Sequence, residues 1–359
     1  MTTSLSDPVP FARGPAMPNR FMLAPLTNKQ SHEDGTLSQD EFHWLAMRAA
    51  GGFGLTMTAA AQVASDGRCF AGQIGIFSDD HIPALARLAA AINSHGGLSS
   101  VQLHHGGRRA LPELINEQPI CPWEDAKLGA REMTTADVER LIESYVAAAL
   151  RAERAGFHGA ELHGAHGYLI AQFLDAENVR TDGYGGRFED RARFLLTIVE
   201  GIRERTRPDF QLGVRLSPER YGVTITEAKR LAEQLMNSGQ IDYLDMSLWD
   251  VFKLPADPEH GDKPLIAHFA DLPRGRARLG VAGQIRDAAT AQACIDAGAD
   301  YVLIGRGAIL HHDFPRRAAA DPGFACVSQP VTRDYLRCEG LGEPFIDYMD
   351  TQWNDFVAD

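Results

Sequence analysis

Two histidines and a tyrosine, His163, His166 and Tyr168, stand close together in the run His-Gly-Ala-His-Gly-Tyr. Imidazole N–H groups can donate hydrogen bonds to a carbonyl oxygen on which negative charge develops. A nearby phenol can supply a proton. A metal site is the alternative, because His104 and His105 could lie close by, but the expected carboxylate ligand is missing. The run therefore favours an oxyanion-binding site with its own acid.

Gly283 and the pair Gly305-Arg306 combine permissive backbone with a cation. Glycine lets the backbone approach a ligand closely, and backbone N–H groups together with a guanidinium bind phosphate. After the seventh and eighth strands of an α/β barrel, this is the usual phosphate site. A glycine turn with a solvated arginine is the alternative.

Arg215 lies within an otherwise apolar run, where a buried guanidinium needs an anion or strong acceptors. An ion pair with a neighbouring carboxylate would explain it equally well. Gln102 and Thr27 are neutral hydrogen-bonding residues that, taken singly, are more often structural. Beside a phosphate site they suit a flat heterocycle such as a flavin, whose reduced ring gains negative charge near N1 and O2.

These residues fall at the ends of short apolar runs that alternate with amphipathic helical patterns. Such runs are typical of parallel strands buried on both faces. We predict eight strands, at residues 21–26, 54–60, 99–103, 159–162, 211–216, 243–247, 279–282 and 301–304.

Helices are expected in the gaps. Thr134 and Asp137 form a capping-box pattern ahead of an apolar stripe that ends at Gly156, and Asp287 can cap a later helix. No Gly-x-Gly-x-x-Gly follows the first strand, which disfavours a doubly wound sheet. We predict a single (β/α)8 TIM barrel at about residues 19–325 with a tail at about 326–359, all in one domain. Long βα loops at 106–133 and 168–188 should cover its C-terminal mouth.

The composition excludes several function classes. The 359 residues are 44% hydrophobic, and 35 Lys and Arg against 48 Asp and Glu give a net charge of −13, which disfavours nucleic acid and anionic lipid as partners. No signal region or membrane-length apolar run occurs, so we expect a cytoplasmic protein. The five cysteines lack any Cys-x-x-Cys, which argues against structural zinc, an iron–sulfur cluster and a disulfide framework.

Six motifs, in order, resemble the Old Yellow Enzyme family, the FMN-dependent NAD(P)H oxidoreductases and ene-reductases. The resemblance covers residues from about 19 to about 314. The motifs are 19–27 (NRFMLAPLT), 102–108 (QLHHGGR), 161–169 (ELHGAHGYL), 180–187 (RTDGYGGR), Arg215 and 304–306 (IGR). One large subgroup of the family has Cys at the position of Thr27 and a pair like His163 and His166, whereas another has Trp at the position of His104.

The resemblance implies a barrel that holds non-covalent FMN at its C-terminal mouth, with NAD(P)H as reductant. Thr27 would bond flavin O4, and the implied cofactor-binding residues are Pro25, Thr27, Ala60, Gln102, Arg215, Gly283, Gly305 and Arg306.

The resemblance also implies a ping-pong reduction of an α,β-unsaturated carbonyl or nitro compound. His163 and His166 would bind the activating oxygen, with His104 also at the substrate site, and Tyr168 or water would protonate Cα after hydride transfer from flavin N5 to Cβ. No metal is implied. The alternatives are a flavin-dependent dehydrogenase or demethylase of one catabolic substrate, and a non-redox metal- or phosphate-dependent barrel lyase. A homo-oligomer is possible, and the tail could pack on a neighbouring subunit, on the pocket rim or as a plain surface helix.

Overall fold

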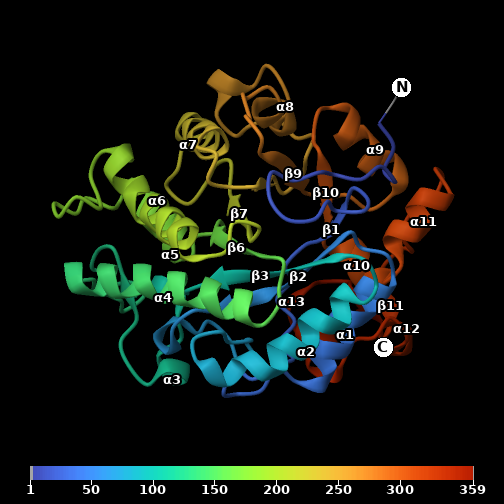
Figure 1. Ribbon diagram of the computed structural model, residues 1–359, viewed down its shortest axis with the longest axis horizontal. Coiled ribbons are helices and arrows are strands. Elements are labelled where there is room, and N and C mark those ends of the chain that lie inside the picture. Colours follow the sequence, from blue (N-terminus) through green and yellow to red (C-terminus); the bar gives the residue numbers. More distant parts are fainter. Residues whose placement is uncertain (1–2, 359) are drawn as a thin grey trace.

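Eight parallel strands close into a barrel in the computed structural model, which describes residues 3–358 (Figure 1). Around the barrel the order is β1-β2-β3-β6-β7-β8-β9-β10. Their bounds are β1 Phe21–Leu23, β2 Leu55–Gln62, β3 Leu98–His104, β6 Gly159–Gly164, β7 Gln211–Leu216, β8 Tyr243–Ser247, β9 Arg278–Ala282 and β10 Tyr301–Ile304. This confirms the predicted (β/α)8 barrel, and β7, β8 and β10 have the predicted bounds.

The first strand is shorter than predicted. It ends at Leu23, and Ala24 makes one more backbone bond, to the Ile304 carbonyl at 3.1 Å. Pro25 has no N–H to continue the ladder. The chain therefore leaves the barrel here, and the segment from Ala24 to Thr27 turns over its mouth.

Helices surround the strands (Figure 1). They are α1 Gln39–Ala50, α2 Ile82–Asn93, α4 Thr135–Arg154, α6 Phe188–Arg205, α7 Ile225–Asn237, α8 Leu265–Ala270 and α9 Ala288–Asp296. The capping box of Thr134 with Asp137 is confirmed at α4, and Asp287 caps α9 by accepting from the Thr290 N–H. Each helix turns its apolar face to the barrel wall and leaves its polar face outside.

Shorter elements lie in the loops. The βα loops hold α3 Pro112–Ile115, α5 Leu169–Leu174, α10 Arg306–Leu310, α11 Phe314–Ala320 and the strand pair β4 Ile120–Cys121 with β5 Arg131–Glu132. Single turns of 3-10 helix occur at Ser65–Gly67, Asp79–His81, Gly107–Arg109 and Pro258–His260.

The N-terminal segment closes the bottom of the barrel. Val9 and Met17 pair as an antiparallel bridge and are buried, and the Phe11 ring lies 5.6 Å from the Tyr243 ring inside the barrel. This plug leaves the C-terminal mouth as the open end.

The C-terminal tail packs against the barrel of its own chain. It contains β11 Val331–Thr332, α12 Arg333–Cys338, α13 Glu343–Gln352 and β12 Val357–Ala358. The Phe345 ring of α13 meets the Trp44 ring of α1 edge-on at 5.1 Å. Buried Arg48 donates to the carbonyls of Ala308, at 3.0 Å from Nη2, and of Glu339, at 2.6 Å from Nη1, which ties α1, α10 and the tail together.

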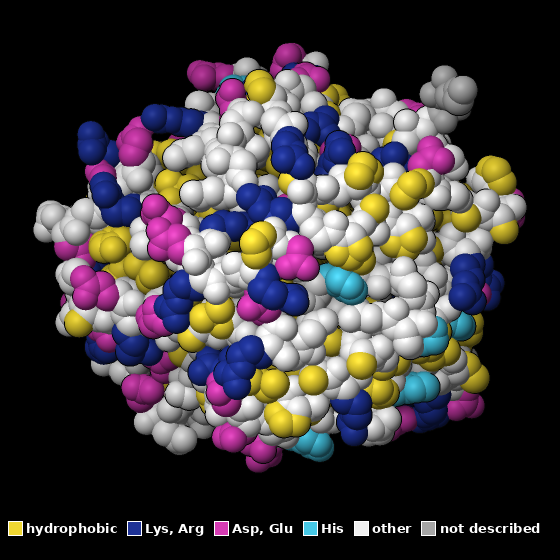
Figure 2. Space-filling model, viewed as in Figure 1, with side chains coloured by type: hydrophobic (Ala, Val, Ile, Leu, Met, Phe, Trp, Pro, Cys, Tyr) yellow, Lys and Arg dark blue, Asp and Glu magenta, His cyan; other side chains and the backbone are white. Residues whose placement is uncertain are grey.

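On the face drawn in Figure 2, basic and acidic side chains are interspersed among apolar ones. Between residues 3 and 358, no helix combines the length and apolar character needed to span a membrane.

Candidate active site

A cavity of about 470 Å³ opens at the C-terminal mouth of the barrel. Its lining comes from the ends of the barrel strands, the βα loops and the tail. His163, His166 and Tyr168 line it. All eight predicted cofactor residues line it as well: Pro25, Thr27, Ala60, Gln102, Arg215, Gly283, Gly305 and Arg306. The structure therefore brings together residues from 25 to 306 that the sequence placed at separate strand ends.

Strained backbone gathers at this mouth. Seven of the eight described non-glycine residues with positive φ lie in loops that follow barrel strands. Four of them line the cavity: His166 at 61°, Tyr221 at 52°, Trp249 at 65° and Gln284 at 55°. Each such conformation costs about 1–3 kcal/mol and persists where the surroundings require it, most often at functional sites. Next to His166, Gly167 has φ 73°, and a Cβ there would lie 2.7 Å from the Tyr221 ring.

Hydrogen bonds assign one tautomer to both histidines. The Ala165 N–H donates to His163 Nδ1 at 3.3 Å, which leaves the proton of that ring on Nε2. His163 Nε2 lies 3.3 Å from His166 Nδ1, and His166 Nε2 lies 2.8 Å from Ser247 Oγ. His163 therefore donates to His166, and His166 donates to Ser247. Both N–H groups lie at the cavity wall, where a ligand oxygen can compete for them.

Burial keeps both imidazoles neutral. Burial together with the charge of Arg215 lowers the pKa of His166 to about 3. Burial also holds the pKa of His163 well below its usual range, and the neighbouring rings of His166 and His104 add to the effect. The pKa of Tyr168 is raised because its phenol is buried. At neutral pH the cavity wall thus carries two neutral N–H donors and a protonated phenol.

His104 does not line the cavity, contrary to its predicted place at the substrate site. It is fully buried behind the wall, with its ring 4.4 Å from the Tyr168 ring and 5.4 Å from the His163 ring, both edge-on. Gln73 Nε2 donates to its Nδ1 at 3.1 Å. Its edge-on contact with the Tyr168 ring can fix the position of that ring.

Two buried carboxyl groups, Glu161 and Asp245, lie in the barrel beneath the cavity. Gln102 Nε2 donates to Glu161 Oε1 at 2.7 Å, and the Tyr301 hydroxyl donates to Asp245 Oδ1. Glu161 Oε2 and Asp245 Oδ2 have no partner among the described residues. Burial and the charge of Asp245 raise the pKa of Glu161 well above its usual range. The two carboxyls therefore share one proton between those oxygens, and the pair carries a charge of about −1.

Arg215 is buried and reaches the cavity above this pair. Its Nη2 donates to Ser247 Oγ at 3.3 Å, and its Nε has no partner among residues 3–358. In the same part of the chain, no carboxylate lies within ion-pair distance of it, so the ion-pair alternative is not supported. A buried N–H without an acceptor is costly, and an oxygen or nitrogen of a ligand would satisfy it.

The opposite end of the cavity suits a phosphate group. Arg286 and Arg306 both line it, and partial burial and the charge of Arg286 lower the pKa of Arg306. Neither has a carboxylate partner among residues 3–358, so two like charges face each other with no protein anion. A Cβ at Gly305 would meet no protein atom closer than 3.7 Å, so the space above this glycine is free for a ligand.

The need for glycine at position 283 comes from a neighbouring loop and not, as the sequence suggested, from a close approach to a ligand. The φ of Gly283 is 152°, and a Cβ there would lie 2.7 Å from the Trp249 backbone. The close approach is therefore made by the β8–α8 loop, and Gly283 lines the cavity as a consequence.

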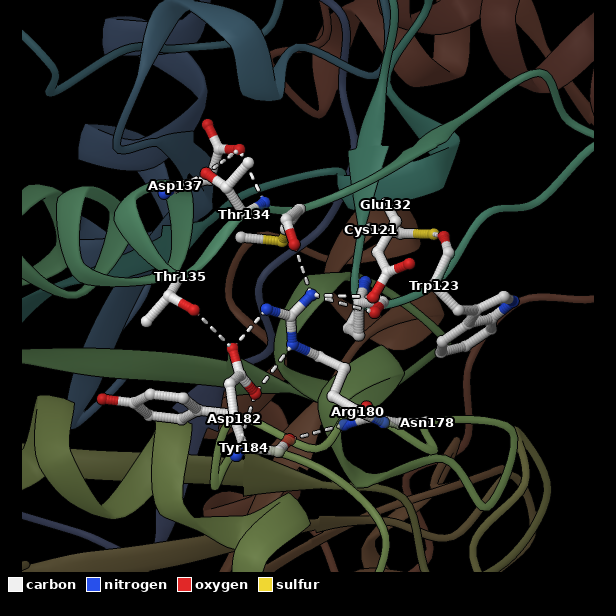
Figure 3. A network of polar contacts seen from close by, with 12 residues as sticks. Cys121, Trp123, Glu132, Thr134, Thr135, Asp137, Asn178, Arg180, Asp182 and Tyr184 are labelled. Atoms are coloured by element: carbon white, nitrogen blue, oxygen red, sulfur yellow. Dashed lines mark hydrogen bonds and ion pairs between the residues drawn. The ribbon is translucent and has the colours of Figure 1, made fainter.

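The two long loops predicted to cover the mouth are joined to each other by Arg180 (Figure 3). Its guanidinium donates to the Pro122 carbonyl at 3.2 Å, to the Met133 carbonyl and to the Asp182 carboxylate. Thr135 of α4 donates to the same carboxylate at 2.9 Å. The motif at 180–187 thus serves to connect segment 168–188 to segment 106–133.

Several lining residues were not predicted as part of the site. They are Phe70, Arg109, Tyr221, Ser247, Trp249, Gln284, Ile285, Arg286, Tyr348 and Trp353. Most come from loops and from the tail, where no periodicity shows which way a side chain points. Tyr348 and Trp353 place the tail at the cavity rim, and the Arg306 guanidinium lies 5.0 Å from the Trp353 ring centre.

No group of three or more His, Cys, Asp or Glu side chains is arranged to hold a metal ion in residues 3–358. His105 is turned away from the cavity toward Asp66, at 3.2 Å.

Comparisons with known proteins agree with this geometry. The model of the NADH:flavin oxidoreductase / NADH oxidase family matches residues 5–321. A probable NADH-dependent flavin oxidoreductase of Bacillus subtilis is 37% identical over 317 residues, which is 84% of each chain. The solved structure of the old yellow enzyme homologue from Zymomonas mobilis has a TM-score of 0.78 at 28% identity, over 93% of this chain and 96% of that one.

A second solved structure, a 2-naphthoyl-CoA reductase in complex with 2-naphthoyl-CoA, has a TM-score of 0.80 at 26% identity. The match covers 89% of this chain but 52% of that one, so this chain spans about half of its length. The chain belongs to the NADH:flavin oxidoreductase / NADH oxidase family, the Old Yellow Enzyme family, and is an FMN-dependent NAD(P)H oxidoreductase.

Proposed function

We propose that the enzyme reduces the activated C=C bond of α,β-unsaturated carbonyl or nitro compounds. One observation carries this proposal: two neutral imidazole N–H groups and a protonated phenol share one cavity wall, at His163, His166 and Tyr168. This is the set of groups that polarises a carbonyl and protonates its α-carbon.

The cavity fits FMN. Arg286 and Arg306 would hold the phosphate, with Gly305 leaving room for it. Gln102, Thr27 and the unsatisfied Nε of Arg215 would meet the polar edge of the ring. When bound there, FMN accepts hydride from NAD(P)H and donates it to the substrate.

The histidines must exchange partners to bind a substrate. The His163 N–H donates to His166, and the His166 N–H donates to Ser247. A carbonyl oxygen between them would accept both N–H groups, and Ser247 would keep its contact with Arg215. The free energy gained by binding a neutral oxygen is small, because the hydrogen bonds from His163 to His166 and from His166 to Ser247 are lost. This gain increases as negative charge builds on the oxygen. The arrangement therefore favours the transition state over the bound substrate.

Tyr168 is placed to hold the proton until it is needed. Burial keeps its phenol protonated, and the Arg109 guanidinium lies over its ring at 4.4 Å from the centre. Tyr168 begins segment 168–188, which Arg180 joins to segment 106–133, and its buried phenol rather than solvent would deliver the proton to Cα.

Isotope tracing tests this proposal. The enzyme is supplied with NADH or NADPH carrying deuterium at C4, one face at a time, and with 2-cyclohexenone. Deuterium should appear only at Cβ of the saturated ketone, and in D2O with unlabelled cofactor only at Cα. If the reduced enzyme leaves all enones and nitroalkenes unchanged, and the oxidised enzyme accepts hydride from a saturated substrate without added NAD(P)H, the dehydrogenase or demethylase alternative would be favoured.

A homo-oligomer, a cytoplasmic location and the grouping of barrel and tail in one domain stay predictions.

A further inference from the structure

Four arginines line the cavity, and among the described lining residues there is no Asp, Glu or Lys. They are Arg109, Arg215, Arg286 and Arg306. None of the four has a carboxylate within ion-pair distance in residues 3–358, although the chain as a whole has a net charge of −13. Cations gathered without protein anions indicate that the ligands of the cavity supply the negative charge.

FMN would account for three of these charges. Its phosphate, with up to about two negative charges, would be held by Arg286 and Arg306, and Arg215 would meet the polar edge of its ring. Arg109 comes from the β3–α4 loop and lies with Tyr168 and His166, at the end of the cavity that the proposed substrate occupies.

Arg109 is held in place there. One N–H of its guanidinium donates to the His166 carbonyl at 2.8 Å, and its Cζ lies 4.4 Å from the centre of the Tyr168 ring. A guanidinium has five N–H donors, so most of its donors remain free for a ligand. Its neighbour Arg108 is different, because it pairs with Asp125 at 3.1 Å and with Glu177 at 3.7 Å and does not line the cavity.

We propose that Arg109 forms an anion subsite that selects substrates carrying a carboxylate near the activated C=C bond. The inference rests on the proposed function, since it assumes that the activating oxygen occupies the His163–His166 pair. With the oxygen at that pair, a second, anionic group of the same molecule reaches the guanidinium across Tyr168. The chemical class is therefore an unsaturated carbonyl compound with a carboxylate substituent.

Binding of two unreactive probes tests this without catalysis. 3-Acetylbenzoate and 3-acetylbenzamide have nearly the same shape and one carbonyl each for the histidines, but only the first is an anion. Each is titrated into the oxidised FMN-loaded enzyme, and the dissociation constant is read from the change in flavin absorbance. Arg109→Gln should raise the dissociation constant of 3-acetylbenzoate by about three- to tenfold at low salt. The dissociation constant of 3-acetylbenzamide should stay unchanged. Arg109→Lys should retain part of the preference, and the control Arg108→Gln should retain all of it.

Three results would overturn the inference. The first is equal affinity of wild-type enzyme for the two probes, or failure to bind the benzoate. The second is an equal loss of affinity for both probes in the Arg109→Gln variant. The third is a loss confined to NADH or NADPH in the reductive half-reaction, which would assign the cation to a dinucleotide phosphate. If Arg109-dependent benzoate binding is found but reduced enzyme turns over no enone, the anion subsite stands and the proposed ene-reductase function fails.

Discussion

Lowering the pH should destabilise the protein through the histidines of the cavity wall. His163 and His166 are neutral and buried in the folded state, and the pKa of His166 lies at about 3. In the unfolded chain an imidazole has a pKa of about 6.5. Below that value the two histidines bind protons in the unfolded state but not in the folded state. The free energy of unfolding therefore falls as the pH falls.

The size of the effect follows from this difference. Between pH 7.5 and 5.5, an unfolded imidazole of pKa about 6.5 changes from about 9% to about 91% protonated, which is worth about 1.4 kcal/mol. Two such groups contribute about 2.7 kcal/mol. Protonation of His166 in the folded state would also break the donation from His163, since His166 Nδ1 would lose its role as acceptor, and protonation of His163 would break the bond that its Nδ1 accepts from Ala165.

Glu41 acts in the opposite direction. Its burial raises its pKa to about 7, so its carboxyl takes up a proton in the folded state as the pH falls and adds stability. The histidine contribution must therefore be read from a difference between proteins and not from wild type alone.

Urea unfolding of the FMN-free protein at pH 7.5 and 5.5 measures that difference. The free energy lost by wild type between the two pH values should exceed the loss in His163→Asn/His166→Asn by about 2.7 kcal/mol. His95→Asn, at an exposed position, is the matched control and should lose as much as wild type. If the double variant loses as much as wild type, the buried neutral state of the histidines is refuted.

Four further predictions concern single positions. Tyr168→Phe should slow enone reduction by about 10²–10⁴-fold and leave flavin reduction by NAD(P)H nearly unchanged, as stopped-flow absorbance would show; equal slowing of both steps would contradict the proton-donor role. Arg306→Gln should weaken the binding of FMN by roughly tenfold or more, as flavin fluorescence would show, but should not weaken the binding of riboflavin, which lacks the phosphate. An equal loss of affinity for both flavins would contradict the phosphate assignment. Arg180→Gln should cost about 3–5 kcal/mol of unfolding free energy, because it leaves the buried Pro122 and Met133 carbonyls without a donor; a wild-type urea midpoint would contradict the role of this side chain. Glu161→Gln should leave the flavin midpoint potential near that of wild type, since the amide replaces the protonated carboxyl. The double variant Glu161→Gln/Asp245→Asn also loses the negative charge of the pair, so its potential should be higher. A shift already present in the single variant would rule out the shared proton.

The sequence predicted the barrel and most of the cavity wall because both depend on strand ends. Strands buried on both faces are recognisable as apolar runs, and polar residues directly after them must meet at one mouth. Thr27, Gln102, Arg215 and Gly305 all reach the cavity for this reason.

Side-chain direction was harder to predict. His104 is buried behind the wall against Gln73 and Tyr168, and nothing in a short apolar run marks that packing. Glu161 and Asp245 lie inside predicted strands, and only the closed barrel brings their carboxyls together. Arg109 and Trp353 lie in loops and in the tail, where tertiary packing alone decides what they face.

The most direct test of the proposed function is the reoxidation of reduced enzyme by 2-cyclohexenone in anaerobic stopped flow. Wild type and His163→Asn/His166→Asn are first shown to hold equal amounts of FMN and to be reduced by NAD(P)H at similar rates. The double variant should then be reoxidised at least about 10²-fold more slowly than wild type, because the oxygen loses both N–H donors. Equal reoxidation rates would contradict the central claim that these two histidines activate the substrate.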